Sequence, residues 1–195
     1  MDWEDIFGQI AAQYGTTLSL SGVELVETHA APPYTKTLDS APRQLRELHA
    51  AGYRLVVATM GFSVYQFPVL KALGLYQHFD AFLTPDLVGH LKHDRAFWDA
   101  DAAALAPGEA LRVHVGDRYD HDCYFPKQYG LRSVLRVADA PPALAEATPF
   151  ERPSLLREVL RLDGLEVSPS LDVLPDAVIT HLDELAGVLA GLEKM

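Results

Sequence analysis

The chain has 195 residues, of which 49% are hydrophobic, and it carries a formal net charge of −11 at pH 7. This length favours one domain or one domain with a small appendage, and the acidic balance argues against binding to nucleic acid. The N-terminus has neither the basic flank nor the apolar stretch of a signal peptide, and no run approaches the roughly 18 apolar residues of a membrane-spanning helix. The single cysteine, Cys123, excludes an intrachain disulfide. We therefore expect a soluble cytoplasmic protein that binds neither nucleic acid nor membrane.

Residues 1–37 are expected to form a helical segment separate from the rest of the chain. Five apolar side chains recur at the spacing of one helix face near the N-terminus: Trp3, Ile6, Phe7, Ile10 and Tyr14. The stretch from Gly15 to Lys36 that follows has no clear period.

From residue 38 onward, short strands and helices are predicted to alternate. Apolar, β-branched runs typical of parallel strands occur at Arg54–Thr59, Asp80–Thr84, Leu111–Asp117, Arg132–Val137 and Asp176–Thr180. Helices are predicted at residues 41–52, after Asp39 or Ser40, at residues 95–106, after Asp94, and at residues 154–162. The last helix carries Leu182, Leu185, Leu189 and Leu192 on one side. This alternation predicts an α/β fold with an open, mostly parallel sheet covered by helices.

Two aspartates follow the third predicted strand. Asp117 comes directly after the apolar run and Gly116, and Asp122 lies five residues further on. Ligands of open parallel sheets bind beyond the carboxyl ends of the strands, and two carboxylates there suit a hard cation such as Mg²⁺. A structural alternative stays open, in which Asp117 caps a loop and Asp122 caps the next helix.

Two further polar side chains occupy related positions in the predicted fold. Thr59 ends an earlier strand, where its hydroxyl can donate to an anionic oxygen, and Lys92 lies in a loop before a helix, where its charge can neutralise a phosphate. Each residue alone is more often a cap or a solvated side chain. The order of hydroxyl, lysine and paired aspartates is the more specific signal.

That order resembles the haloacid dehalogenase (HAD) superfamily. The segment LRELHAAGYRLVVATMG resembles its second motif, with Thr59 as the hydroxyl residue, and the segment LGLYQHFDAFLTPDLVGHLKHDRAFW resembles its third, with Lys92 as the lysine. The segment VHVGDRYDHDCYFPKQYGLRSV resembles the fourth motif, GDxxxxD, with Asp117 and Asp122 as its acids. His121 departs from this pattern, since Asn or Asp is usual there, and Pro126 interrupts the helix that follows.

The resemblance implies a HAD-like, Rossmann-like fold with a three-layer parallel sheet, in which residues 38–195 form the core and residues 1–37 resemble part of a cap. It implies a Mg²⁺-dependent phosphatase acting on a small phosphorylated metabolite. Thr59 and Lys92 would be catalytic, and Asp117 and Asp122 would hold the metal. A 2-haloacid dehalogenase and a catalytically inactive HAD-fold binding protein are the alternatives, and the oligomeric state is not predicted.

The first motif of the family, DxDGT, supplies its nucleophilic aspartate, and it is not found upstream of Thr59. Three explanations are open. The strand that carries the motif lies upstream of Met1, or the protein is an inactive binding module. In the third, the segment GVELVET takes the place of the central strand and brings Glu27 or Thr28 near the position of the nucleophile.

Overall fold

The computed structural model describes residues 3–100, 110–156 and 173–195, and in these residues the strands form two parallel sheets. The smaller sheet pairs β1 (Val56–Ala58) with β2 (Ala81–Leu83). The larger sheet has the order β3-β4-β5, with bounds Val113–Gly116, Arg132–Arg136 and Ala177–Ile179. Each predicted strand is confirmed, and every pairing is parallel, as expected for an α/β fold.

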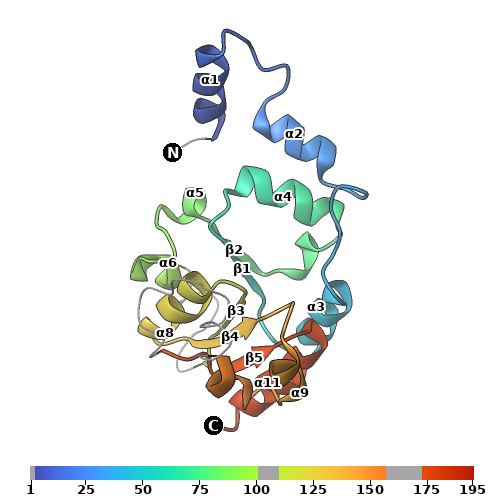
Figure 1. Ribbon diagram of the computed structural model, residues 1–195, viewed down its shortest axis with the longest axis vertical. Helices are drawn as coiled ribbons and strands as arrows, with labels where there is room; N and C mark the ends of the chain where they lie inside the picture. The colour runs from blue at the N-terminus through green and yellow to red at the C-terminus, as the bar shows by residue number, and fades with distance from the viewer. Residues whose placement is uncertain (1–2, 101–109, 157–172) are drawn as a thin grey trace.

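Helices precede, separate and follow these strands (Figure 1). Before β1 come α1 (Trp3–Gln13), α2 (Gly22–His29) and α3 (Ala41–Ala50), and between β1 and β3 come α4 (Ser63–Ala72), the 3-10 turn η1 (Tyr76–His78), α5 (Pro85–Val88) and α6 (Arg95–Asp99). After β3 come the π-helical turn η2 (Tyr119–Tyr124), α8 (Phe125–Gln128), α9 (Pro142–Glu146), the 3-10 turn η3 (Leu182–Glu184) and α11 (Leu185–Leu192). The predicted helix at 154–162 lies largely outside the described residues.

The segment GVELVET is a helix, so the third explanation, in which it takes the place of the central strand, is wrong. It forms α2, and the reason is local. The Ser21 hydroxyl accepts a hydrogen bond from the Glu24 amide at 3.1 Å, while the Glu24 carboxylate accepts one from the Ser21 amide at 2.8 Å. This reciprocal capping box starts a helix at Gly22 and leaves Glu27 exposed on it.

Helices cover both faces of the larger sheet. Leu48 of α3 and Leu185, Val188 and Leu189 of α11 pack on the face that carries Val134. On the opposite face, Leu144 of α9 and Leu156 pack against Leu135 and Val178. The adjacent residues Val134 and Leu135 of β4 thus point into two different apolar clusters, as expected of a strand that is covered on both faces.

The smaller sheet has its own apolar cluster. Phe97 and Trp98 of α6 pack against Leu83 of β2, and Val56 and Ala58 of β1 are partly buried against the same cluster. Phe97 and Trp98 are core residues, since they are only 0% and 2% exposed.

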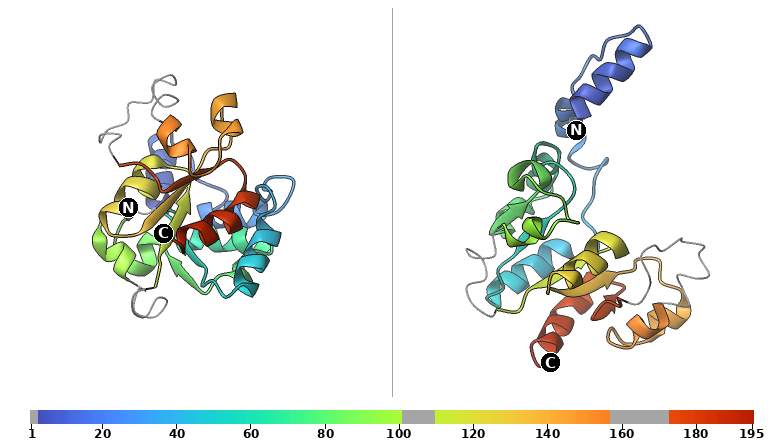
Figure 2. Two further views of the ribbon diagram at one scale, coloured as in Figure 1. Left: turned by 90° about the horizontal axis from the view of Figure 1, so that it is seen from below. Right: turned by 90° about the vertical axis from the view of Figure 1, so that its left-hand side faces the viewer.

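The helices α1 and α2 lie beyond α4, at the end of the molecule opposite to α11 (Figures 1 and 2). The Glu4 carboxylate tethers the start of α2 by accepting hydrogen bonds from the Gly22 and Val23 amides at 3.1 Å. The predicted apolar face of α1 is not buried as a whole, because Trp3 is 51% exposed and Ile10 48%. The boundary after residue 37 stays a prediction.

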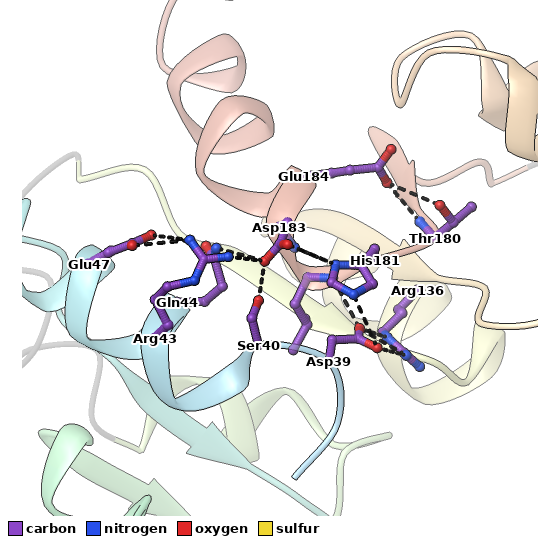
Figure 3. Close-up of polar contacts among 11 residues, drawn as sticks. Asp39, Ser40, Arg43, Gln44, Glu47, Arg136, Thr180, His181, Asp183 and Glu184 are labelled. Atoms are coloured by element: carbon purple, nitrogen blue, oxygen red, sulfur yellow. Dashed lines mark hydrogen bonds and ion pairs between the residues drawn. The ribbon is translucent and has the colours of Figure 1, made fainter.

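A polar cluster fastens the start of α3 to the larger sheet and to the turn before α11 (Figure 3). Asp39 has a positive φ of 45° and accepts hydrogen bonds from Arg136 at 3.0 Å and from the Leu182 amide at 3.1 Å. One turn on, Arg43 pairs with Asp183 at 2.6 Å. These contacts join segments that lie about 100 or more residues apart in the sequence.

We predict that Asp39→Asn lowers the free energy of unfolding by about 1–2 kcal/mol at pH 7, because Asn tolerates the left-handed backbone but loses the ion pair. Burial would raise the pKa of Asp39, but the Leu182 amide and Arg136 outweigh burial and hold this pKa below its ordinary value. The carboxylate therefore stabilises the folded state above about pH 4, and this contribution is lost as the pH falls through the lowered pKa. Urea unfolding measured from pH 7 to pH 3 should show that the difference in the free energy of unfolding between Asp39→Asn and wild type becomes smaller as the pH falls. The control Asp183→Asn, which removes a half-exposed carboxylate, should cost less.

Candidate active site

The carboxyl ends of β1 and β3 open onto one cavity of about 290 Å³. Its lining comes from the end of β1 (Ala58, Thr59 and Met60), the end of β3 and the loop after it (Val115–Arg118), and three more side chains, Lys92, His121 and Asp122. The structure thus brings together Thr59, Lys92, Asp117 and Asp122, the four residues singled out in the sequence, and their chemical roles stay predictions.

The Asp122 carboxylate lies at the centre of the hydrogen bonds in this cavity. One oxygen, Oδ1, accepts from Lys92 Nζ at 2.6 Å and contacts His114 Nε2 at 2.8 Å. The other, Oδ2, accepts from the backbone amides of Asp117 at 3.0 Å and Arg118 at 2.9 Å. A carboxylate has about four acceptor directions, so protein donors use the whole capacity of Asp122.

Gly116 makes this arrangement possible because it has no side chain. A Cβ atom at residue 116 would lie 2.3 Å from the Cγ and Oδ2 atoms of Asp122. The turn η2 brings Asp122 back against the strand end, and the Ser133 hydroxyl donates to the Asp122 carbonyl at 2.8 Å, which fastens this turn to β4. Gly116 therefore lets the Asp122 side chain lie directly against the backbone at the end of β3.

Burial and charge together determine the protonation of this cluster. Burial alone would raise the pKa of Asp122, but the hydrogen bond from His114 and the charge of Lys92 outweigh it and place the pKa well below the ordinary value. Burial lowers the pKa of His114, against the opposing effect of Asp122. Asp122 is therefore ionised at neutral pH, and His114 is a neutral imidazole whose Nε2–H donates to it.

Lys92 is held by its backbone as well as by its ammonium group. Its carbonyl accepts a hydrogen bond from Trp98 Nε1 at 2.7 Å, and its amide contacts Met60 Sδ at 3.4 Å. Nζ also lies 5.8 Å from the centre of the Trp98 ring. The side chain is only 5% exposed, so its charge acts inside a largely desolvated pocket.

The family model of the haloacid dehalogenase-like hydrolases matches residues 2–130 of this sequence, which include Thr59, Lys92, Asp117 and Asp122. The chain belongs to this family of hydrolases. It is 30% identical over 176 residues to haloacid dehalogenase-like hydrolase domain-containing protein 3 of Bos taurus, covering 85% of this chain and 69% of that protein. It is 27% identical to a glyceraldehyde 3-phosphate phosphatase of Methanocaldococcus jannaschii, covering 68% of this chain and 58% of the relative.

Solved structures show the same fold. A HAD phosphatase from Thermococcus onnurineus superposes with a TM-score of 0.63 at 25% identity, over 97% of this chain and 73% of that one. The HAD-like α/β fold expected from the motifs is therefore confirmed. Among the described helices, none is long and apolar enough to cross a membrane.

Thr59 of this HAD-like chain presents its hydroxyl to the cavity from the end of β1. Its amide donates to the Leu83 carbonyl at 3.0 Å, which keeps the backbone in line with β2, and its Oγ1 accepts from the Gly61 amide at 3.1 Å. Within the described part of the chain, the hydroxyl proton has no acceptor. It is therefore available to an oxygen of a ligand.

Asp117 and His121 lie at the mouth of the cavity. The Asp117 side chain is exposed, while His121 is partly buried at the position where the family usually has Asn or Asp. In the described residues, no group of three or more His, Cys, Asp and Glu side chains could enclose a metal ion. A site with one or two carboxylates and several waters fits Mg²⁺, and Asp117 offers such a carboxylate.

The sequence analysis missed His114 as a site residue. It lies inside β3, where it reads as one polar residue in an apolar run, and only the fold turns it toward Asp122. Glu27, considered in the sequence analysis as a replacement for the nucleophile, does not line the cavity. His90 and His93, on either side of Lys92 in the sequence, lie half-exposed beside Asp94 and outside the cavity lining.

We predict that Gly116→Ala destabilises the protein by about 1–3 kcal/mol, because the added methyl group must displace the Asp122 carboxylate from its four donors. Thermal unfolding measures the loss as a lower Tm. Gly187→Ala is the matched control, because a Cβ there meets no atom within 4 Å and lies on the exposed side of α11. The control should unfold at the wild-type Tm or slightly above it, since Ala favours helix. An unchanged Tm in Gly116→Ala would contradict the role given to Gly116.

Proposed function

We propose that Thr59, Lys92, Asp117 and Asp122 form the phosphate-binding and metal-binding part of a Mg²⁺-dependent phosphatase. Its substrate would be a small phosphorylated metabolite. The observation that carries the proposal is the convergence of the Thr59 hydroxyl, the Lys92 ammonium and two aspartates on one cavity at the strand ends. The cavity volume, about 290 Å³, suits a small ligand rather than a polymer. The matches to phosphatases support the same assignment.

Each residue has a separate task in this proposal. The Thr59 hydroxyl donates to a phosphoryl oxygen, and Lys92, whose Nζ is oriented by Asp122, offsets the negative charge of the phosphoryl group. Asp117 would hold Mg²⁺, with Asp122 as the second carboxylate of the site, and the ion would supply charge neutralisation for the bound phosphate.

The part of the chain that the structure describes places no third carboxylate in the cavity lining. A phosphoryl group bound there would meet a hydroxyl, a lysine and the two aspartates already assigned, and no free carboxylate nucleophile. This observation favours a second candidate function, a protein that binds a phosphorylated ligand without hydrolysing it. A 2-haloacid dehalogenase has less support, because its reaction needs no Mg²⁺, whereas the pair Asp117 and Asp122 suits a metal ion.

We predict that the protein hydrolyses 4-nitrophenyl phosphate when Mg²⁺ is present, and that Asp117→Asn lowers kcat/KM by roughly 100-fold or more because the metal loses its carboxylate. The assay follows release of nitrophenolate with and without EDTA. Asp139→Asn is the control, because it removes an exposed carboxylate outside the cavity lining and should leave the rate unchanged.

The phosphatase and the binding protein are distinguished by measuring phosphate binding and hydrolysis on the same samples. Calorimetric titration with inorganic phosphate reports binding whether or not turnover occurs. Phosphate binding that is about tenfold weaker in Thr59→Val, with no hydrolysis by wild type, would establish the binding protein and refute the phosphatase. Absence of both binding and turnover would refute both functions.

A further inference from the structure

His114 of β3 reaches the same carboxylate oxygen as Lys92. Its Nε2 atom lies 2.8 Å from Asp122 Oδ1 and 3.4 Å from Lys92 Nζ, and the imidazole is buried. A carboxylate oxygen accepts and an ammonium only donates, so Nε2 either donates to Asp122 or accepts from Lys92. The contact to Asp122 has the length of an ordinary hydrogen bond, whereas the contact to Lys92 is longer than the usual range. Nε2 therefore carries a proton and donates it to Asp122.

This assignment leaves two N–H groups of Lys92 for a ligand. An ammonium has three N–H groups, and one of them donates to Asp122 Oδ1 at 2.6 Å. A protonated Nε2 of His114 cannot accept a second one. In the part of the chain that the structure describes, Lys92 Nζ then has no acceptor other than Asp122, and Lys92 lines the cavity. The other two N–H groups are available to the oxygens of an anion bound there.

One pair of facing residues in the larger sheet holds both ends of Asp122. His114 of β3 and Ser133 of β4 are partners in the parallel register. The His114 ring donates to the Asp122 carboxylate, and the Ser133 hydroxyl donates to the Asp122 carbonyl at 2.8 Å. The Trp98 ring, whose Nε1 donates to the Lys92 carbonyl, packs edge-on against the His114 ring with their centres 4.8 Å apart. Ring packing therefore fixes the direction from which His114 meets Asp122.

We propose that His114 is a positioning residue of the phosphate site, which acts on Lys92 through Asp122. Its Nε2–H occupies the second acceptor direction of Asp122 Oδ1. Lys92 therefore gives this oxygen a single hydrogen bond and directs its other two N–H groups to the phosphoryl oxygens. Without the imidazole, Oδ1 is free to accept a second N–H group of Lys92, and the ammonium turns away from the ligand. This role depends on the proposed function, since the ligand that Lys92 meets is a phosphoryl group.

Two substitutions separate the hydrogen bond of His114 from the bulk of its side chain. His114→Leu keeps an apolar side chain but removes the donor, whereas His114→Gln keeps an N–H donor at the end of the side chain. In calorimetric titration with inorganic phosphate, His114→Leu should bind about tenfold more weakly than wild type, and His114→Gln should stay within about threefold of wild type. The control Val188→Ala trims a core residue of α11 outside the cavity lining, so it should lower the Tm and leave phosphate affinity unchanged.

A second measurement follows Asp122 itself in the absence of ligand. The amides of Asp117 and Arg118 donate to Asp122 Oδ2, so a loosened carboxylate leaves them open to hydrogen exchange. Exchange read by NMR should be at least about tenfold faster at both amides in His114→Leu. It should stay close to the wild-type rate in His114→Gln and Val188→Ala. In wild type, NMR of the ring nitrogens should show the proton of His114 on Nε2.

Several outcomes would overturn the role given to His114. They are wild-type phosphate affinity or unchanged amide exchange in His114→Leu, an equal loss of affinity in Val188→Ala, and lost affinity in a folded His114→Gln. An unprotonated Nε2 in wild type would overturn it whether or not the variants fold. Wild type that binds no phosphate would refute the proposed phosphate site as well, and this failure is distinct because it needs no substitution.

Discussion

The structure of the site depends on how the Asp122 carboxylate is satisfied. A buried carboxylate is costly unless its charge is paired and its acceptor directions are filled. Lys92, His114 and two backbone amides meet both conditions, and they come from the loop before α6, from β3 and from the turn after it. One side chain therefore fixes the relative position of three segments. The absence of a side chain at Gly116 is the condition that lets Asp122 approach them.

The same geometry leaves the other side of the cavity open. Thr59 and Lys92 present a hydroxyl and a cation, and Asp117 presents a carboxylate to solvent, while the strands that carry Thr59 and Asp117 are not paired with each other.

The five strands were predictable because each contains a short run of apolar residues between segments with helix or turn signals. The four predicted site residues were recognisable because they follow strands or precede helices in a characteristic order: Thr59, Lys92, Asp117 and Asp122. His114 was not predicted as a site residue. Side chains alternate between the two faces of β3, and the sequence does not show which face meets Asp122. The segment GVELVET was misassigned because its apolar content outweighed a capping box, SGVE, that is visible in the sequence.

The sequence by itself determined the helices and strands and the kinds of side chain in the site. It could do so because hydrophobic periodicity, helix caps and motif order are each visible within a short stretch of residues. In the sequence, Asp117 and Asp122 are equivalent acids of one motif. Only the tertiary structure decided that the Asp122 carboxylate is hydrogen-bonded by four protein donors while the Asp117 side chain is exposed to solvent. It also decided which strands pair, β1 with β2 and β3 with β4. Strand pairing depends on which segments meet across the whole fold, and no local pattern encodes it.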